Sequence, residues 1–360
     1  MKIDFYISSL SSGGAERVLT YLATDFANKN HDVSITSFEK RPQFYDIDPA
    51  VILNKCDNTQ KNKITSVFAD FFGMCRYIRQ RKADVAISFL SRSNIMLVLA
   101  CLFSKTKTIV CDRNNLLRKY PKIVFMASCF VYAFANAVCV QTNEIKKYYP
   151  KYLQKKIFVL ENPLDFDAMD KQLEGEELQK EKTVLSVGRL EDQKDFVTLI
   201  YAFERISAGY PEWKLKIFGQ GKNEQILAEL INELDLNNRV FLCGVTHKPF
   251  LEMKRAKIFV LSSFYEGFPN VLCEAMHAGL ACISTNCECG PAELIENGEN
   301  GFLVPVGDID AMAEKIRFLI ENEMVRAEIG QKAVKTTDRL ELSTICDGWI
   351  EMVEKIANME

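Results

Sequence analysis

The sequence has few of the residues that build metal centres, and none of the expected spacings. Only three of its 360 residues are histidine, and they lie far apart. The twelve cysteines are scattered, and only Cys287 and Cys289 lie within two residues of each other. No zinc-ligand spacing results. We therefore expect reduced core thiols in a cytoplasmic protein, and no metal site.

Long apolar runs, internal repeats and low-complexity tracts are also lacking. The apolar N-terminal run is short and soon interrupted, which favours a first strand over a signal peptide. Residues 123–143 form a 21-residue stretch without charge, long enough to span a membrane. Because this stretch contains Ser128, Asn136 and Gln141, we interpret it as a buried helix followed by a strand.

Charge is distributed unevenly along a chain whose composition is that of a soluble globular protein. Residues 1–160 hold 24 Lys and Arg against 12 Asp and Glu, hence +12; the remaining 21 and 36 give −15. A basic first half indicates a nucleic acid, an acidic membrane surface or a phosphorylated substrate as partner. A merely solvated basic surface is the alternative.

Strand and helix signals alternate along the whole chain, which predicts α/β units with parallel sheets. In the first half we expect strands at 2–8, 32–37, 84–88, 107–111 and 137–141, and helices at 15–28, 64–82, 94–103 and 121–136. After a polar linker we expect strands at 183–187, 214–218, 240–243, 258–261, 281–284 and 302–304, with helices between them, a further helix at 310–322 and an amphipathic helix at 342–359. Two doubly wound domains normally bind ligands at the carboxyl ends of their strands, in a cleft between them.

The most informative motif places two carboxylates on either side of a turn. The run 258–261 predicts a buried strand, and Pro269 and Asn270 suit the start of a helix. Glu266 then follows the strand, while Glu274 lies one turn into the helix. The free N–H groups of the helix start point into the same space, which suits a phosphate-bearing ligand. Paired carboxylates are also typical of glycosidases.

Three other loops combine a preceding strand with glycine. Glycines let backbone N–H groups approach an anion, and Arg and Lys side chains bind phosphate oxygens. The residues concerned are Gly13, Gly14 and Arg17; Gly188, Arg189 and Lys194; and Gly219 and Gly221. Neither the dinucleotide fingerprint nor the P-loop is matched, so each loop alone is equally compatible with a plain turn.

A fourth polar group, Asp112, Arg113, Asn114 and Asn115, follows the strand 107–111. Polar side chains directly after an apolar strand favour a ligand site over packing. Three Asp-x-Asp patterns, beginning at residues 46, 165 and 308, lie in turn-like contexts where Asp is common. They do not predict a metal site.

Taken together, these motifs resemble the family-4 retaining glycosyltransferases of the GT-B fold, most closely bacterial enzymes that build lipopolysaccharide, capsule or lipid-linked oligosaccharides. The matching segments, in the family's order, are Gly13-Gly14-Ala-Glu-Arg17, Gly188-Arg189…Lys194, Gly219-Gln-Gly221, Glu266-Gly-Phe-Pro-Asn…Glu274 and Asn297-Gly-Glu-Asn-Gly301-Phe-Leu-Val. The resemblance implies two Rossmann-like domains facing across a cleft. Residues 1–165, completed by the C-terminal helix 341–360, would bind the acceptor, and residues 166–340 the nucleotide sugar.

The resemblance also implies roles for individual residues. Arg189 and Lys194 would neutralise the diphosphate leaving group, Glu266 would face the transferred sugar, and Glu274 would hold the ribose hydroxyls. The donor would also be bound by Gly13, Gly14, Arg17, Gly188, Gly219, Gly221, Gly267, Phe268, Pro269, Asn270, Val271 and Leu272. Many relatives have a histidine that contacts the donor sugar where this chain has Arg113. An arginine stays protonated, so Arg113 would donate to a sugar or phosphate oxygen rather than act as a base.

The expected reaction is transfer of a hexose or N-acetylhexosamine from a UDP-sugar to a lipid-linked saccharide, without metal or cofactor. Electrostatic stabilisation of the leaving diphosphate suffices for it. We expect retention by front-face attack, with Glu266 as a nucleophile in the alternative mechanism. Two other functions are compatible with the same residues: a non-hydrolysing UDP-sugar 2-epimerase, and a non-catalytic scaffold at the membrane.

The basic first half would then meet an anionic membrane. Basic residues cluster around one expected helix, at Lys61, Lys63, Arg76, Arg79, Arg81 and Lys82, and again at Arg118, Lys119 and Lys122. Each contributes about 1 kcal/mol on anionic lipid. We therefore expect a cytoplasmic protein, peripheral on the inner face of the cell membrane. No base-reading module appears, so a nucleic acid is not expected.

Overall fold

The computed structural model describes residues 1–11, 13–38, 43–55, 63–113 and 121–359. The chain forms two compact units. Unit 1 comprises Met1–Pro163 and Leu342–Glu360, and unit 2 comprises Leu164–Glu341. The chain therefore leaves unit 1 once and returns to it through its C-terminal helix.

In its described residues, unit 1 contains a parallel seven-stranded sheet in the order β3-β2-β1-β4-β5-β6-β7. Its strands are β1 (Lys2–Ile7), β2 (Asp32–Ser37), β3 (Ile52–Lys55), β4 (Val85–Phe89), β5 (Lys107–Cys111), β6 (Ala137–Val140) and β7 (Ile157–Val159). All five residues of β4 are buried. Such continuous apolar strands are typical of a parallel sheet covered on both faces.

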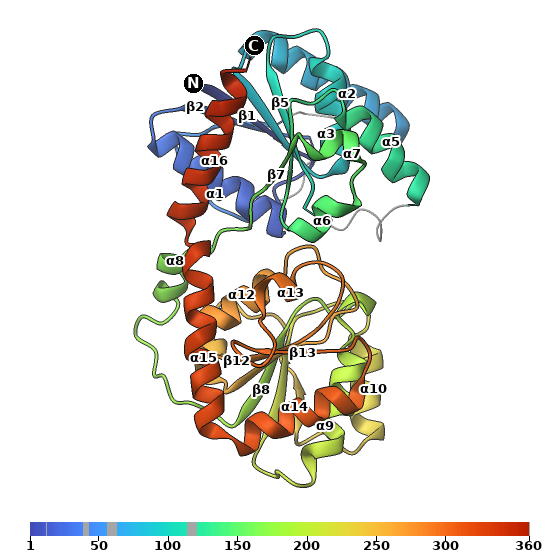
Figure 1. Cartoon of the computed structure of the whole chain (residues 1–360), viewed down its shortest axis with the longest axis vertical. Helices are drawn as coiled ribbons and strands as arrows, with labels where there is room; N and C mark the ends of the chain where they lie inside the picture. Colours follow the sequence, from blue (N-terminus) through green and yellow to red (C-terminus); the bar gives the residue numbers. More distant parts are fainter. Residues whose placement is uncertain (12, 39–42, 56–62, 114–120, 360) are drawn as a thin grey trace. The chain divides into compact units, whose positions relative to one another are not determined.

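Helices cover both faces of this sheet. They are α1 (Gly14–Asn28), α2 (Lys63–Arg81), α3 (Ser91–Cys101), α5 (Lys122–Tyr132), α6 (Asn143–Tyr148), α7 (Lys151–Gln154) and α16 (Leu342–Ala357). α16 packs against α1, and α2, α3 and α5 lie on the other side of the sheet (Figure 1). Trp349 of α16 is fully buried and stacks on Phe89, which fixes the C-terminal helix to the core of unit 1.

Unit 2 also contains a parallel sheet, here of six strands in the order β10-β9-β8-β11-β12-β13. Its strands are β8 (Thr183–Val187), β9 (Lys214–Phe218), β10 (Val240–Leu242), β11 (Ile258–Leu261), β12 (Ala281–Thr285) and β13 (Phe302–Val304). β8 and β11 are direct neighbours at the centre. The loops that follow these two strands therefore leave the sheet side by side.

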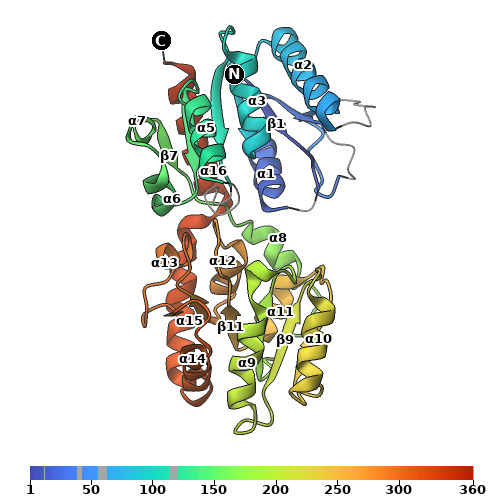
Figure 2. The same ribbon diagram turned by 90° about the vertical axis from the view of Figure 1, so that its right-hand side faces the viewer.

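The helices of unit 2 are α8 (Phe166–Lys171), α9 (Phe196–Ser207), α10 (Glu224–Glu233), α11 (Pro249–Arg255), α12 (Asn270–His277), α13 (Pro291–Leu294), α14 (Ile309–Glu321) and α15 (Glu323–Thr337), with two 3-10 turns, η1 (Asp192–Lys194) and η2 (Asp338–Leu340). Helices α9, α10 and α14 pack on one core cluster, and α11 and α12 on another (Figure 2). The sheet is thus covered on both faces.

The structure confirms the predicted fold class, two doubly wound parallel α/β units. The predicted elements omit β3, β7 and several short helices, together with the long helix α15. The charge-free stretch does form a helix, α5, followed by the strand β6. However, the predicted burial holds for only one side of this helix: Phe125 and Cys129 are buried, whereas Ile123, Met126 and Phe130 are exposed. No helix in the described part of the chain is both long and apolar enough to span a membrane.

Candidate active site

The central feature of unit 2 is an ion pair at the carboxyl ends of its two central strands. Lys194 ends the loop after β8, and Glu266 lies in the loop after β11. Lys194 Nζ lies 2.6 Å from Glu266 Oε1, and the two side chains are only 13% and 7% exposed. A shielded pair of this kind is held far more firmly than a surface pair. The structure therefore joins two of the predicted catalytic residues.

Two serines that the sequence analysis did not single out fix this pair. Ser263 Oγ donates to Glu266 Oε1 at 2.6 Å, and Ser262 Oγ donates to the main-chain oxygen of Lys194 at 2.7 Å. Thr285, at the end of β12, in turn donates to the main-chain oxygen of Ser263 at 2.6 Å. The available signal was the polar doublet directly after the apolar strand β11.

Arg189 is placed differently from Lys194, although both belong to the loop after β8. Its side chain is 68% exposed and is ion-paired with Glu191 at 3.2 Å. An exposed pair of this kind holds a side chain weakly. The guanidinium is thus free to change partner when an anion arrives.

The glycines of the next loops have a packing role. A Cβ on Gly219 would lie 1.8 Å from the Gly188 carbonyl oxygen, and one on Gly221 would lie 2.4 Å from that of Leu190. Gly219 also has a φ of +145°, which favours glycine. Gly188 itself faces the Lys194 stem, since its Cβ would lie 3.2 Å from Lys194 Cε. These glycines let the loops after β8 and β9 pack backbone to backbone beneath Lys194.

The turn before α12 places the helix start and Glu274 as predicted, but two of the N–H groups that were predicted to be free are hydrogen-bonded. Helix α12 starts at Asn270, after Pro269, and Glu274 lies one turn further, nearly buried. The N–H groups of Asn270 and Leu272 donate to the carbonyls of Phe268 and Pro269. These two donors are therefore used within the turn. The turn also packs on the loop after β12, since a Cβ on Gly290 would lie 2.5 Å from Pro269 Cδ.

The glycine loop of unit 1 carries an acidic neighbour that the sequence analysis missed. Gly13 caps α1, and Gly14 is the first residue of that helix. The carboxylate of Glu16 folds back so closely that a Cβ on Gly13 would lie 2.1 Å from its Oε2. A glutamate at the third helical position is the usual partner in a capping box. The Tyr45 hydroxyl donates to the Gly13 carbonyl at 3.2 Å, and Arg17 N–H does so at 3.0 Å.

Arg113 lies at the carboxyl end of β5 but is turned into unit 1. It is 7% exposed, and its guanidinium lies over the rings of Phe89 and Trp349, at 4.9 and 5.2 Å from their centroids. Nη1 donates to Asn162 Oδ1 at 2.6 Å. Nε and Nη2 are buried without a hydrogen-bond partner in the described part of the chain. Arg113 therefore combines a packing role with unused donors.

Asp112, the neighbour of Arg113, is a packing residue, contrary to the site role expected for this group. Its carboxylate is buried and accepts hydrogen bonds from Asn94, Tyr132 and Tyr149. Burial raises the pKa of Asp112 to about 6, although these hydrogen bonds oppose the shift. Asn114 and Asn115, predicted beside it, lie outside the described residues.

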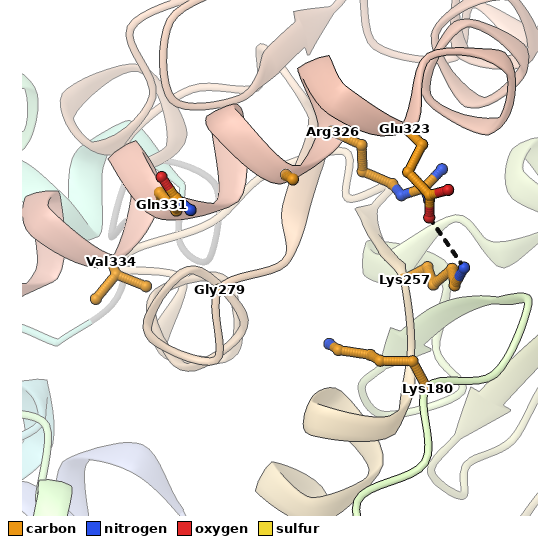
Figure 3. A pocket seen from close by; sticks show the side chains of 8 residues that line it. Lys180, Lys257, Gly279, Glu323, Arg326, Gln331 and Val334 are labelled. Atoms are coloured by element: carbon orange, nitrogen blue, oxygen red, sulfur yellow. Dashed lines mark hydrogen bonds and ion pairs between the residues drawn. The ribbon is translucent and has the colours of Figure 1, made fainter.

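A separate cavity of unit 2, of about 400 Å³, lies away from the Lys194–Glu266 pair. Lys257 and Gly279 line it from just before β11 and β12, hence from the amino ends of these strands. Figure 3 shows Lys257 paired with Glu323, beside Arg326 and Lys180. No predicted site residue lines this cavity. Among the described residues, no group of three or more His, Cys, Asp or Glu side chains is arranged to hold a metal ion.

Comparison with known proteins places the chain in a family. Residues 169–336 match the model of "Glycosyl transferases group 1", and residues 12–168 match that of "Glycosyltransferase Family 4". Over 99% of both chains, the sequence is 31% identical to a Campylobacter jejuni protein, "GalNAc-alpha-(1->4)-GalNAc-alpha-(1->3)-diNAcBac-PP-undecaprenol alpha-1,4-N-acetyl-D-galactosaminyltransferase".

Solved structures show the same fold at lower identity. Sucrose-phosphate synthase from Thermosynechococcus elongatus is similar with a TM-score of 0.84 and 16% identity, over 99% of both chains. HepE of Anabaena, in complex with UDP and glucose, has a TM-score of 0.80 and 19% identity, over 98% of this chain and 99% of that one. The chain therefore belongs to the family-4 glycosyltransferases of the GT-B fold.

Proposed function

We propose that this glycosyltransferase moves a hexose or N-acetylhexosamine from a UDP-sugar to a lipid-linked saccharide, with retention of configuration and without a metal ion. The observation that carries this proposal is the shielded Lys194–Glu266–Ser263 cluster at the carboxyl ends of β8 and β11. Two further facts support it. The similar Campylobacter protein acts, by its name, on an undecaprenyl-diphosphate saccharide, and the similar Anabaena protein binds UDP and glucose.

In the proposed mechanism, Lys194 and Arg189 neutralise the departing nucleoside diphosphate. Lys194 is held in place before the donor binds, whereas Arg189 leaves its weak pair with Glu191. A fixed cation acts at the developing charge without reorganisation, which is the largest electrostatic contribution to such reactions. Gly188, Gly219 and Gly221 keep the loop under Lys194 in place.

The carboxylates hold the donor. The hydrogen bonds that Lys194 and Ser263 donate to Glu266 both end on Oε1, and Oε2 accepts a hydroxyl of the transferred sugar. Glu274 accepts from the ribose hydroxyls. Residues 267–272, apart from the bonded N–H groups of Asn270 and Leu272, bind the remaining polar groups of the donor. The acceptor attacks from the face that the diphosphate leaves, and a diphosphate oxygen takes its proton. An E266Q enzyme with nearly normal turnover would exclude Glu266 as a nucleophile.

Unit 1 contributes a second set of substrate contacts. Gly13, Gly14 and Arg17 offer backbone and guanidinium donors to the diphosphate or the acceptor. Arg113 offers the buried donors Nε and Nη2 to a sugar or phosphate oxygen. The basic residues of unit 1, including the exposed Arg76 and Arg79, draw the enzyme to the anionic inner face of the cell membrane. Lys61, Arg118 and Lys119 lie outside the described residues.

The test is incubation of the whole protein with labelled UDP-, GDP- and ADP-sugars, with and without a bacterial membrane lipid extract. We expect label in the lipid fraction only with a UDP-sugar, and a product anomer that matches the donor. Epimerised free sugar without lipid would indicate the 2-epimerase, and no product with any donor would indicate a scaffold. Either result overturns the proposal. Thermal stabilisation by each UDP-sugar then ranks the donors.

A further inference from the structure

The outer face of α5 is an apolar stripe that the fold does not use. Ile123, Met126, Phe130 and Phe134 are all exposed, and their spacing of three or four residues places them on one side. The helix has a separate buried side, formed by Phe125, Ser128, Cys129 and Tyr132. The stripe is therefore additional to the core contacts of α5, and no charged residue interrupts it between Lys122 and Glu144.

The neighbouring end of α3 extends this stripe. α3 packs against α5, and just at its end Leu102 and Phe103 are exposed, Phe103 completely. A hollow of about 540 Å³ is lined by both Leu102 and Phe134, so the two apolar areas meet there. Both helices lie on the same side of the sheet of unit 1 (Figure 1). We call this area, from Leu99 to Phe103 and from Ile123 to Phe134, the α3–α5 face.

Basic and hydroxyl side chains border the α3–α5 face. The hollow between the two helices is also lined by Lys105, Lys107 and Thr106. Residues 63–143 contain 12 Lys and Arg but only three acidic residues. Two of these three are buried and already engaged: Asp70 with Arg92, and Asp112 in its tyrosine network. Lys105 and Lys107 therefore border the apolar face at the hollow, and the exposed Lys122 lies at the start of α5.

This combination identifies the kind of partner. A second copy of the chain would bring two basic surfaces together, which costs electrostatic energy. An anionic lipid surface satisfies both features, since acyl chains take up apolar side chains and phosphates meet the cations. We propose that the α3–α5 face inserts into an anionic bilayer surface. Phe103, Phe130 and Phe134 enter the boundary between headgroups and acyl chains, and Lys105 and Lys107 contact lipid phosphates.

The proposal deepens the peripheral location proposed above and changes its physical basis. Attraction by basic residues alone weakens strongly with salt, because mobile ions screen exposed charges. Insertion of aromatic side chains does not. Binding through the α3–α5 face is therefore expected to fall only partly at high salt.

The test is sedimentation of the full-length protein with vesicles of phosphatidylethanolamine and phosphatidylglycerol, at low and high salt. We expect the wild type to sediment under both conditions. The double variant F103S/F130S should lose about tenfold or more in partitioning, because two exposed aromatic side chains no longer enter the lipid. The matched control is I226S/M324S, which changes two exposed apolar residues of unit 2 and should sediment as wild type.

Three outcomes would overturn the proposal: no sedimentation of the wild type, equal sedimentation of F103S/F130S, or an equal loss in the control. Analytical ultracentrifugation without lipid supplies a fourth, a wild-type dimer that F103S/F130S abolishes. Thermal unfolding verifies that both variants fold. Sedimentation needs neither donor nor acceptor, and transfer to a detergent-solubilised acceptor should be unchanged in F103S/F130S. The lipid contact and the transferase activity can therefore fail independently.

Discussion

The two units place a cation and a carboxylate at the carboxyl ends of central strands, but arrange them differently. In unit 2, Lys194 and Glu266 contact each other directly and remain slightly accessible. In unit 1, Arg113 and Asp112 are adjacent in sequence but have separate partners: Arg113 binds aromatic rings and Asn162, and Asp112 accepts from neutral donors. The same residue chemistry thus gives a charged site in one unit and a buried framework in the other.

The direct contact between Lys194 and Glu266 suits unit 2, rather than unit 1, for the binding of a charged ligand. A cation paired with a shielded carboxylate, which a serine hydroxyl holds in turn, is fixed in position before an anion arrives. A carboxylate in a closed network of tyrosines fixes a loop but offers nothing to a ligand. We therefore expect substitutions at the unit 2 pair to affect turnover, and those at the unit 1 pair to affect stability first.

The largest effect is expected from K194A. Removal of the proposed leaving-group cation should lower kcat by about 10² to 10³-fold. The matched control is K222A, because Lys222 is an exposed lysine of the neighbouring loop, paired with Asp192, and its loss should leave turnover nearly normal. Steady-state kinetics with a UDP-sugar measures both. A K194A enzyme with wild-type kcat would contradict the expectation that the unit 2 ion pair serves turnover.

The next effect concerns the loop packing under Lys194. G219A forces a Cβ against the Gly188 carbonyl and should lower the unfolding free energy of unit 2 by about 3 kcal/mol or more. Because the chain has only two tryptophans, Trp213 reports on unit 2 in a W349F background. G244A is the control, since its φ is also positive but open space surrounds it. If G219A and G244A lower the unfolding free energy equally, the cost comes from the positive φ and not from the contact with the Gly188 carbonyl.

The third prediction concerns Asp112, whose protonation should make the stability of unit 1 depend on pH. The pKa of Asp112 is about 6 in the folded chain and 3.8 as its reference, so the native state holds the extra proton between these values. Its contribution to stability is therefore present at low pH and is lost as pH rises through about 6. Relative to D112N, wild-type unit 1 should lose up to about 3 kcal/mol between about pH 4 and 7.

Urea unfolding of unit 1, followed by Trp349 fluorescence in a W213F background, measures this difference at each pH. The control variant is D84N, which makes the same change at an exposed aspartate of unit 1. A pH-independent difference between wild type and D112N would mean that burial does not raise the pKa of Asp112.

Much of the fold follows from the sequence because its signals are local. Apolar runs and helical periodicity predict most strands and the long helices directly. The edge strand β3 was missed because its four residues are only partly buried and carry no alternation. The exposed face of α5 was missed because a charge-free helix looks like a core helix, and only packing shows which side is covered.

The sequence predicts which residues form the site, but not how these residues contact one another. Glu266 and Lys194 follow from their motifs, yet they are 72 positions apart, and their contact depends on β8 and β11 being neighbours. The burial of Arg113 depends on Trp349, in a helix at the far end of the chain. Such contacts are set by sheet order and by the returning C-terminal helix, which local patterns do not encode.

The smallest of these effects tests whether rigidity of the unit 2 pair matters in itself. S263A removes the hydrogen bond from Ser263 Oγ to Glu266 Oε1 but leaves the ion pair with Lys194 intact. A lost hydrogen bond to a charged group corresponds to about tenfold in kcat, and KM for the donor should change little. S186A is the control, because Ser186 is a buried serine of the same sheet that binds only the Val260 carbonyl in the described part of the chain. If S263A lowers thermal stability as S186A does but leaves kcat unchanged, Ser263 serves the fold alone, and the ion pair needs no further support.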